Sequence, residues 1–470
     1  MSYKSARAHE IRSQNIRMAR ELVERYDPNK KTVILLPGGL GSRLERTKKP
    51  YSDNSPGPFT LYERIWMDWG IIFDEDALTM EIKSDGRDKG NRIVRANGPL
   101  NFLVEVYDGT EKFFNERGYN YLGYGFDWRR PLLESAMWLE DFLTRFKNGV
   151  IAQFNGDKNM NPLPKTTLIC HSHGGLVAAL FLQRVFSGMT NVTPKKVNQW
   201  IDNVITVGTP FYANAGHIRR YYKGEDALNI FYGTDTITRI AGTMPGPYIF
   251  LFLDKDTYDK DGAKLGLTRY PVRDAQNQNV EIDPYADSTL SRYPDWVNPE
   301  FLKKAKKERL SYRKVLPKAV RDSIYHLRGV RKTTGVEWLW KNIDGSTFDP
   351  ENDKLPITNV DGEGDGTVPK WAARLAQVPG EQVYDLKVAQ KHLDLMEHEE
   401  TLNVMRFILD NDRLPLHMTL YDKKYIGIKR ASRSRTDHFL RGIKQGTVNI
   451  QDDVASDPAI WRGIMEDINI

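Results

Sequence analysis

Short apolar segments alternate with amphipathic ones through the first half of the chain. Residues 6–26 are polar with helical spacing, and residues 31–36 (KTVILL) form an apolar run that ends in a glycine-rich loop. A second apolar run at 119–126 precedes an amphipathic segment at 132–146. The pattern predicts a peripheral helix followed by pairs of a buried strand and a helix.

The segment around residue 172 repeats this pattern most clearly. The run KTTLIC at 165–170 meets HSHGG, and LVAALFLQRVF at 176–186 continues with small and apolar residues at helical spacing. Residues 203–207 (NVITV) form the next apolar run and lead into a GTPF loop. Strands that alternate with helices pair in parallel and are covered on both faces. We therefore expect an α/β fold with a mostly parallel sheet covered by helices.

The alternation is interrupted in the second half of the chain. Between about 211 and 321 it gives way to aromatic, Gly/Pro-containing and charged stretches, which we interpret as an inserted cap or lid domain. Strand patterns resume at 323–328 and 382–388, and residues 402–409 suit a last core helix. A chain of 470 residues exceeds the size at which one core usually stops growing. The predicted divisions are a helical cover at 1–30, a core at 31–210 and 322–412, the cap at 211–321, and a basic extension at 413–470.

Ser172 lies where an expected strand turns into an expected helix, and Gly174 and Gly175 follow it. A nucleophilic serine needs such a strained turn, which exposes its hydroxyl, and a larger side chain two residues later would collide with the sheet. The usual first glycine of the G-x-S-x-G motif is Cys170 here, where a small thiol suits the space. The motif predicts that Ser172 is the nucleophile of an α/β-hydrolase fold.

Backbone N–H groups must point to the place where negative charge develops in ester cleavage. We expect one such donor from His173, the residue after the nucleophile, and a second from the loop LLPGGLGSRLE. Gly39 is the predicted donor in that loop, where Gly38 and Gly41 also let the backbone approach a substrate. A plain glycine turn is the alternative interpretation.

The acid and the base follow the serine in chain order in this fold. Asp365, in the glycine-rich loop GEGDGTVP, is the predicted acid, and His392, directly after the strand expected at 382–388, is the predicted general base. His398 falls on the following helix and is expected to be structural. The alternative for Asp365 is a solvent turn or a calcium loop, although the EF-hand spacing and its terminal Glu are absent. A zinc site at His171 and His173 has no evident third ligand.

Composition and charge narrow the function further. Hydrophobic residues make up 40% of the chain and charged residues 28%, as in globular domains, and the net charge of +6 is too diffuse to predict nucleic-acid binding. A mildly basic surface suits peripheral contact with anionic lipid. The C-terminal extension concentrates positive charge in Lys423, Lys424, Lys429, Arg430, Arg433 and Arg435. These residues form either a solvated face or a phosphate-binding patch.

The location of the protein is predicted from what the sequence lacks. One cysteine permits no intrachain disulfide, and neither an apolar signal segment nor a membrane-spanning run occurs. We expect a cytoplasmic protein. The alternative is export by a secretion system that needs no signal peptide.

Five blocks of sequence, in order, resemble the lecithin:cholesterol acyltransferase-like branch of the α/β-hydrolases. They are LLPGGLGSRLE, GYGFDWRR, the turn around Ser172, the GTPF loop and the GDGTVP loop ahead of a histidine. The resemblance implies a lipase, phospholipase A or acyltransferase with a Ser-His-Asp triad, an acyl-enzyme intermediate and no cofactor or metal. It also implies that the substrate-binding residues include Leu40, Asp127, Trp128 and Phe211. The chain departs from the family at Cys170 and at His173, where methionine is commoner, and in lacking the cysteine pairs of secreted members.

The expected function is therefore cleavage or transfer of a carboxylic ester of a lipid-like or small substrate. One alternative is an exported effector phospholipase that uses the same chemistry, and another is a relative that binds lipid or protein without catalysis. Within the predicted cap, MPGPYIFLFL at 244–253 is interpreted as buried core or as an acyl-chain groove and lipid-facing lid.

Overall fold

The computed structural model describes residues 2–51, 61–66, 80–100, 106–154, 165–214, 217, 239–291, 293–341 and 357–415. Residues 416–470 of the predicted basic extension, with its six lysines and arginines, lie outside the described residues. The boundaries predicted for the domains stay predictions.

The centre of the molecule is a six-stranded sheet in the order β12-β9-β7-β6-β1-β5. Every neighbouring pair in it is parallel. Its strands, in that spatial order, are Val383–Leu386, Ile324–Gly329, Ile201–Val207, Thr166–His171, Thr32–Leu36 and Asn120–Gly123. All residues of β1 and β6 are buried. Because successive side chains of a strand point to opposite faces, both faces of the sheet centre are covered.

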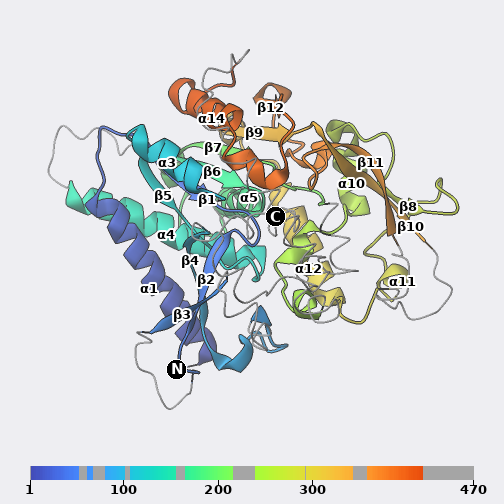
Figure 1. Cartoon of the computed structure of the whole chain (residues 1–470), viewed down its shortest axis with the longest axis horizontal. Coiled ribbons are helices and arrows are strands. Elements are labelled where there is room, and N and C mark those ends of the chain that lie inside the picture. The colour runs from blue at the N-terminus through green and yellow to red at the C-terminus, as the bar shows by residue number, and fades with distance from the viewer. Residues whose placement is uncertain are drawn as a thin grey trace, which may run out of the picture.

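Helices surround this sheet (Figure 1). They are α1 (Tyr3–Glu24), α3 (Asp108–Glu116), α4 (Leu132–Gln153), α5 (His173–Phe186), α6 (Pro194–Trp200) and α14 (Glu399–Asn411). Helix α4 packs between α1 and α5, and α5 packs on β6. Helix α5 is buried along almost its whole length, as expected from its apolar composition. Each of these helices except α3 and α6 overlaps a segment that the hydrophobic pattern predicted.

Two smaller antiparallel or mixed sheets flank the central one. One has the order β3-β2-β4 and consists of Tyr62–Trp66, Ser42–Thr47 and Val94–Pro99. The other has the order β11-β10-β8 and consists of Ile357–Gly364, Lys332–Trp340 and Val272–Asp274. Strand β8 lies in the range predicted as the cap, and it pairs with β10, which lies beyond that range. This part of the chain is on the right in Figure 1, beside the central sheet.

Helices dominate the rest of the range predicted as the cap. They are α10 (Lys255–Leu265), α11 (Asp287–Leu290), α12 (Pro299–Tyr312) and α13 (Lys318–Arg321), with a short 3-10 helix, η3, at Pro247–Phe250. Helix α12 contacts both α5 and η3. Further 3-10 turns are η2 (Lys89–Asn91), η4 (Lys370–Ala372), η5 (Gly380–Gln382) and η6 (His392–Met396).

A parallel central sheet with helices around it and a sharp strand-to-helix turn after β6 is the α/β-hydrolase fold that the sequence predicts. The loops after β1, β6, β7 and β12 all leave the carboxyl edge of this sheet. In parallel sheets this edge is where sites form. The loops that carry Ser172, Gly208 and His392 therefore meet at one edge. Asp365 follows β11 of the neighbouring sheet and packs against the end of β9, since a Cβ on Gly329 would lie 2.6 Å from Asp365 Cβ.

Candidate active site

Ser172 occupies a strained turn between β6 and α5. Its backbone has φ 47° and ψ −117°, a conformation that is costly for a residue with a side chain. Its N–H donates to the carbonyl oxygen of Val207 at 2.9 Å, which fixes the turn against the end of β7. This is the geometry of a nucleophile elbow, in which strain keeps the serine at the edge of the sheet.

The glycines after Ser172 are required by close packing. A Cβ on Gly174 would lie 2.4 Å from the carbonyl oxygen of Leu36, and a Cβ on Gly175 would lie 2.1 Å from Thr209 Oγ1. Both distances are far below contact distance, so no larger residue fits. Cys170, at the place of the usual first glycine, is fully buried inside β6, and burial raises the pKa of its thiol. Cys170 therefore replaces the usual glycine as a residue of the core.

Asp365 and His392 form a buried pair. His392 Nδ1 lies 2.7 Å from Asp365 Oδ2. The other carboxylate oxygen, Oδ1, accepts the N–H groups of Thr367 at 3.0 Å and Val368 at 2.7 Å. Because a carboxylate oxygen only accepts, His392 carries its proton on Nδ1 and leaves Nε2 as the basic nitrogen. Nε2 is buried and makes no hydrogen bond within the described part of the chain.

Gly208, the first residue of the GTPF loop, lets this pair sit against the end of β7. A Cβ there would lie 3.0 Å from Asp365 Oδ2 and 3.1 Å from His392 Cε1. Its φ of 57° also favours glycine. Since Ser172 N–H bonds the residue before Gly208, the serine and the imidazole approach the same strand end. Among the described residues no hydrogen bond joins Ser172 to His392, as is common when substrate is absent.

The two predicted oxyanion donors also lie beside the elbow. Gly38 is so close to it that an added Cβ would be 3.2 Å from Ser172 Cβ, and Gly39 comes next. A Cβ on Gly39 would be 3.8 Å from His173 Nδ1. His173 is the first residue of α5, where the N–H has no partner within the helix. Gly39 and His173 therefore both lie beside the serine, and their role as oxyanion donors stays a prediction.

Residues 244–253 lie over this region as buried structure. Phe250 would contact a Cβ on Gly39 at 3.6 Å, and its ring centroid is 4.8 Å from that of His173. Arg309 of α12 binds the segment from inside, donating to the carbonyl oxygens of Ile249 at 2.8 Å and Leu251 at 3.0 Å. The segment thus forms a fixed apolar wall beside Gly39.

The predicted substrate-binding residues fall into different surroundings. Leu40, with φ 59°, accepts the indole N–H of Trp66 on its carbonyl oxygen at 2.6 Å, and Trp66 packs edge-to-face on Trp128 at 5.4 Å. This places Trp128 near the loop that carries Gly39. Phe211 is fully buried, and its ring packs on those of Tyr312 and His326. A role of these residues in substrate binding stays a prediction.

The fourth predicted substrate-binding residue, Asp127, is held in a buried ion network. Arg129 binds both of its carboxylate oxygens, at 2.9 and 2.8 Å, and Arg7 approaches within 3.3 Å. Arg129 also bonds Asp88 at 2.9 Å. Burial alone would raise the pKa of Asp127, but the arginines overcome this effect and lower it. The described contacts of this carboxylate are with the arginines of the network and with the backbone N–H of Arg129 at 3.2 Å, and none is with Ser172.

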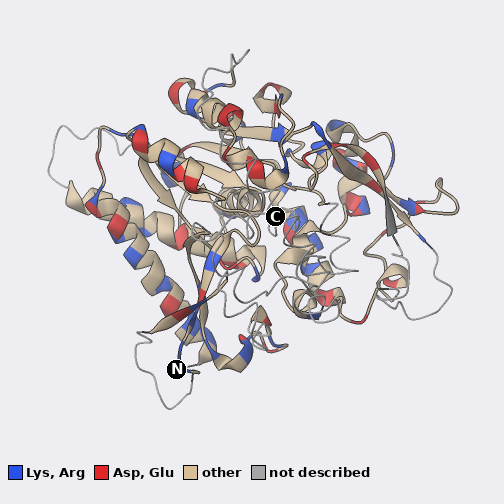
Figure 2. Cartoon of the chain, in the orientation of Figure 1, with Lys and Arg blue, Asp and Glu red and all other residues tan. Residues whose placement is uncertain are grey.

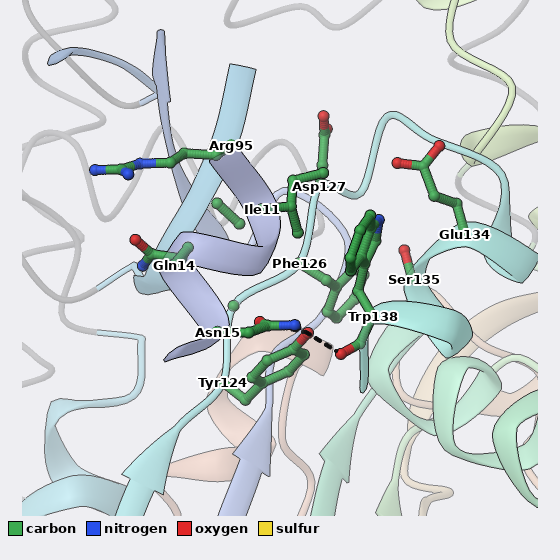
Figure 3. Close-up of a pocket in the computed structure, with 12 residues that line it drawn as sticks. Ile11, Gln14, Asn15, Arg95, Tyr124, Phe126, Asp127, Glu134, Ser135 and Trp138 are labelled. Carbon is green, nitrogen blue, oxygen red and sulfur yellow. Dashed lines mark hydrogen bonds between the residues drawn. The ribbon is translucent and has the colours of Figure 1, made fainter. Parts of the chain in front are cut away.

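A small cavity of about 30 Å³ adjoins Asp127 (Figure 3). It is lined by residues of α1, β4, α4 and the segment after β5, and among them Asn15 donates to the carbonyl oxygen of Trp138 at 3.0 Å. None of the predicted triad residues lines it. Its volume suits one or two water molecules rather than an ester.

The structure bears on the other features that the sequence raises, which are His398, a metal site and a membrane-spanning segment. His398 caps α14, accepting the N–H of Glu400 at 3.2 Å, which is a structural role. Within the described ranges no group of three or more His, Cys, Asp and Glu side chains could hold a metal ion. None of the described helices has the length and apolarity that crossing a membrane requires.

Positive and negative residues are interspersed, for example along α1 (Figure 2).

Two residues of the site were not predicted. Tyr107 lies under the loop at Gly38, and His171 lies between that tyrosine and His392. Nothing in the sequence around Tyr107 singles it out. The position of His171 next to Ser172 in the sequence suggests only a metal ligand.

No protein-family model matches the chain, and the search of curated proteins gave no match. Among solved structures, the Tle4–Tli4 complex is similar with a TM-score of 0.47 and 14% identity, over 81% of this chain and 96% of that chain. Bacillus licheniformis lipase BlEst2 in its mature form has a TM-score of 0.29 and 13% identity, over 83% and 95%. EstA from Clostridium botulinum has a TM-score of 0.33 and 13% identity, over 84% and 91%. At these scores the likenesses carry no argument about activity, and the fold assignment rests on the chain's own sheet order and elbow turn.

Proposed function

We propose that this chain is a serine ester hydrolase or acyltransferase that acts on lipid-like carboxylic esters. The observation that carries the proposal is the buried Asp365–His392 pair, whose Nε2 is left basic beside the strained turn that holds Ser172. The five ordered sequence blocks favour the lecithin:cholesterol acyltransferase-like branch of the fold.

In the proposed mechanism Ser172 Oγ attacks the ester carbonyl carbon while His392 Nε2 takes the hydroxyl proton. The carbonyl oxygen becomes an oxyanion that accepts hydrogen bonds from the N–H groups of Gly39 and His173. When the tetrahedral intermediate collapses, the bond to the alcohol breaks and His392 returns the proton to the leaving oxygen. Asp365 keeps the proton on Nδ1 and stabilises the imidazolium.

The second half of the cycle regenerates the enzyme. Water or a second alcohol gives its proton to His392 Nε2 and attacks the acyl-enzyme carbonyl. The bond from the carbonyl carbon to Ser172 Oγ then breaks, His392 returns the proton to that oxygen, and an acid or a new ester leaves. The apolar wall at Phe250 favours an apolar acyl group next to Gly39. The proposed partners are therefore lipid esters, met at an anionic membrane surface by peripheral contact.

The test is hydrolysis of p-nitrophenyl esters from acetate to palmitate, with phospholipid vesicles alongside, by the wild type and by Ser172→Ala. Activity that disappears in the variant supports the proposal, and the chain-length profile separates esterase from lipase or phospholipase. Adding an alcohol acceptor and measuring a new ester separates transfer from hydrolysis. A wild type that is inactive on every ester, or a variant that keeps its rate, would refute it.

A further inference from the structure

Three hydrogen bonds connect the loop after β1 to the backbone of His392. Gly38 N–H donates to the Tyr107 hydroxyl at 2.6 Å, Tyr107 Oη lies 2.9 Å from His171 Nδ1, and His171 Nε2 lies 3.1 Å from the carbonyl oxygen of His392. Tyr107 and His171 are fully buried. The contacts are therefore shielded from solvent, and they begin next to Ser172, because a Cβ on Gly38 would lie 3.2 Å from Ser172 Cβ.

The chemistry of the partners sets the direction of each bond. A carbonyl oxygen only accepts, so His171 Nε2 carries the proton that it donates to His392. Burial first, and the neighbouring His392 second, hold the pKa of His171 well below its ordinary value, so the ring is neutral and has one N–H. Nδ1 must then accept a hydrogen bond that the Tyr107 hydroxyl donates. The hydroxyl oxygen in turn accepts a hydrogen bond from the Gly38 N–H.

The packing leaves this bridge little freedom. A Cβ on Gly41 would lie 2.8 Å from Tyr107 Oη, and a Cβ on Gly38 would lie 3.1 Å from His171 Nδ1. Gly41 N–H also donates to the Gly38 carbonyl oxygen at 3.1 Å, which closes the loop around the hydroxyl. The rings of His171 and His392 are 4.9 Å apart.

We infer that Tyr107 and His171 are positioning residues that fix the oxyanion loop and the general base relative to each other across the nucleophile. The inference rests on the proposed function, since it assigns the bridge to the alignment of Gly39 N–H and His392 Nε2 with Ser172. A small displacement of an oxyanion donor or of the general base lowers the rate of the chemical step more than it weakens substrate binding.

The decisive variant is Tyr107→Phe, which removes only the hydroxyl oxygen. Its matched control is Tyr121→Phe on β5, because the Tyr121 hydroxyl is also buried but makes no hydrogen bond within the described structure. With p-nitrophenyl butyrate, Tyr107→Phe should lower kcat by ~10- to 100-fold and leave KM within about threefold. Tyr121→Phe should stay within about twofold of the wild type in both constants.

Two variants of His171 separate the halves of the bridge and serve if Tyr107→Phe fails to fold. His171→Gln retains a donor near the place of Nε2 but loses the acceptor for Tyr107, whereas His171→Asn retains the acceptor and loses the donor. Each should lower kcat in the same way. Adding Tyr107→Phe to His171→Gln should cost less than the sum of the two separate losses, because both interrupt one connection.

The Ki of a trifluoromethyl ketone inhibitor distinguishes a positioning role of Tyr107 and His171 from a purely structural one. Its tetrahedral adduct needs the oxyanion donors, so its Ki should rise in parallel with the loss of kcat while KM stays near its wild-type value. A Tyr107→Phe enzyme that matches Tyr121→Phe in kcat and Ki overturns the bridge and leaves the proposed function standing. A wild type without any ester activity overturns both.

Discussion

His392 Nδ1 lies 2.7 Å from Asp365 Oδ2, and the two side chains are 2% and 1% exposed. A buried carboxylate in this position fixes one tautomer of the imidazole and stabilises its protonated form. The orientation of the pair is fixed in turn by the N–H groups of Thr367 and Val368 and by the lack of a side chain at Gly208.

Replacing Asp365 by asparagine should abolish most of the activity. The amide would keep an oxygen for the N–H groups of Thr367 and Val368 and present an NH₂ group to His392, which would move the imidazole proton to Nε2. We expect kcat for a p-nitrophenyl ester to fall about 10⁴-fold. A loss of less than tenfold in a folded Asp365→Asn protein would contradict the assigned role.

The elbow should tolerate no side chain at Gly174. In Gly174→Ala the new Cβ would meet the Leu36 carbonyl oxygen at 2.4 Å, and we expect a loss of about 1–3 kcal/mol or more in the free energy of unfolding. Gly380→Ala is the control, because nothing lies within 4 Å of a Cβ there. Its stability should change by no more than about 0.5 kcal/mol. Urea unfolding checks both, and equal stabilities would show that the packing around the turn is misjudged.

Arg309 should matter more for stability than the exposed Arg269. It is fully buried, it donates to several carbonyl oxygens of residues 249–252, and it lies 3.3 Å from the buried Asp254. Arg309→Met would leave that carboxylate buried without its cation, at a cost of about 3–5 kcal/mol. Arg269→Met removes an exposed pair with Glu337 and should cost at most about 1 kcal/mol. Similar midpoints of unfolding for the two variants would show that Arg309 does not hold the segment that contains Phe250 in place.

The stability of the protein should rise with pH above neutrality because of Lys147. Burial lowers the pKa of this lysine from 10.5 to about 7, and its ammonium group lies 2.8 Å from Thr166 Oγ1. Between these two pKa values the unfolded chain binds a proton that the folded chain does not, so the free energy of unfolding increases with pH. Below pH 7 both states are protonated and this contribution is constant.

Urea unfolding at pH 7, 8 and 9 tests this linkage. Lys147→Met should be more stable than the wild type at pH 7 and should show a smaller increase towards pH 9. Lys165→Met, at a position where the side chain is 49% exposed, should keep the wild-type slope. A Lys147→Met slope equal to that of the wild type would contradict the shift.

The strands and helices of the core were predictable because their patterns are local. The runs at 31–36, 165–170 and 203–207 became β1, β6 and β7, and the turn at Ser172 was expected from the small residues after it. Asp365 was predicted from chain order and its glycine-rich loop, and His392 from the strand that precedes it. The structure brings these two side chains together.

Other parts of the site depend on contacts between distant segments. Tyr107 acquires its place through partners 69 and 64 residues away, Gly38 and His171, and no local pattern signals them. The ion pair between Asp127 and Arg7 and the contact of Phe250 with Gly39 likewise join segments that the sequence separates widely. The pairing of β8 with β10 across the predicted cap boundary has the same origin.

Ser172 is tested as the nucleophile by reacting the full chain with a fluorophosphonate and mapping the modified residue by mass spectrometry. A fluorophosphonate reacts with a serine that is activated by a neighbouring base and bordered by oxyanion donors. We expect one adduct per chain, on Ser172, together with loss of ester hydrolysis, and much slower labelling of Asp365→Asn. Modification at another residue, or hydrolysis that persists after Ser172 is fully labelled, would contradict this role of Ser172.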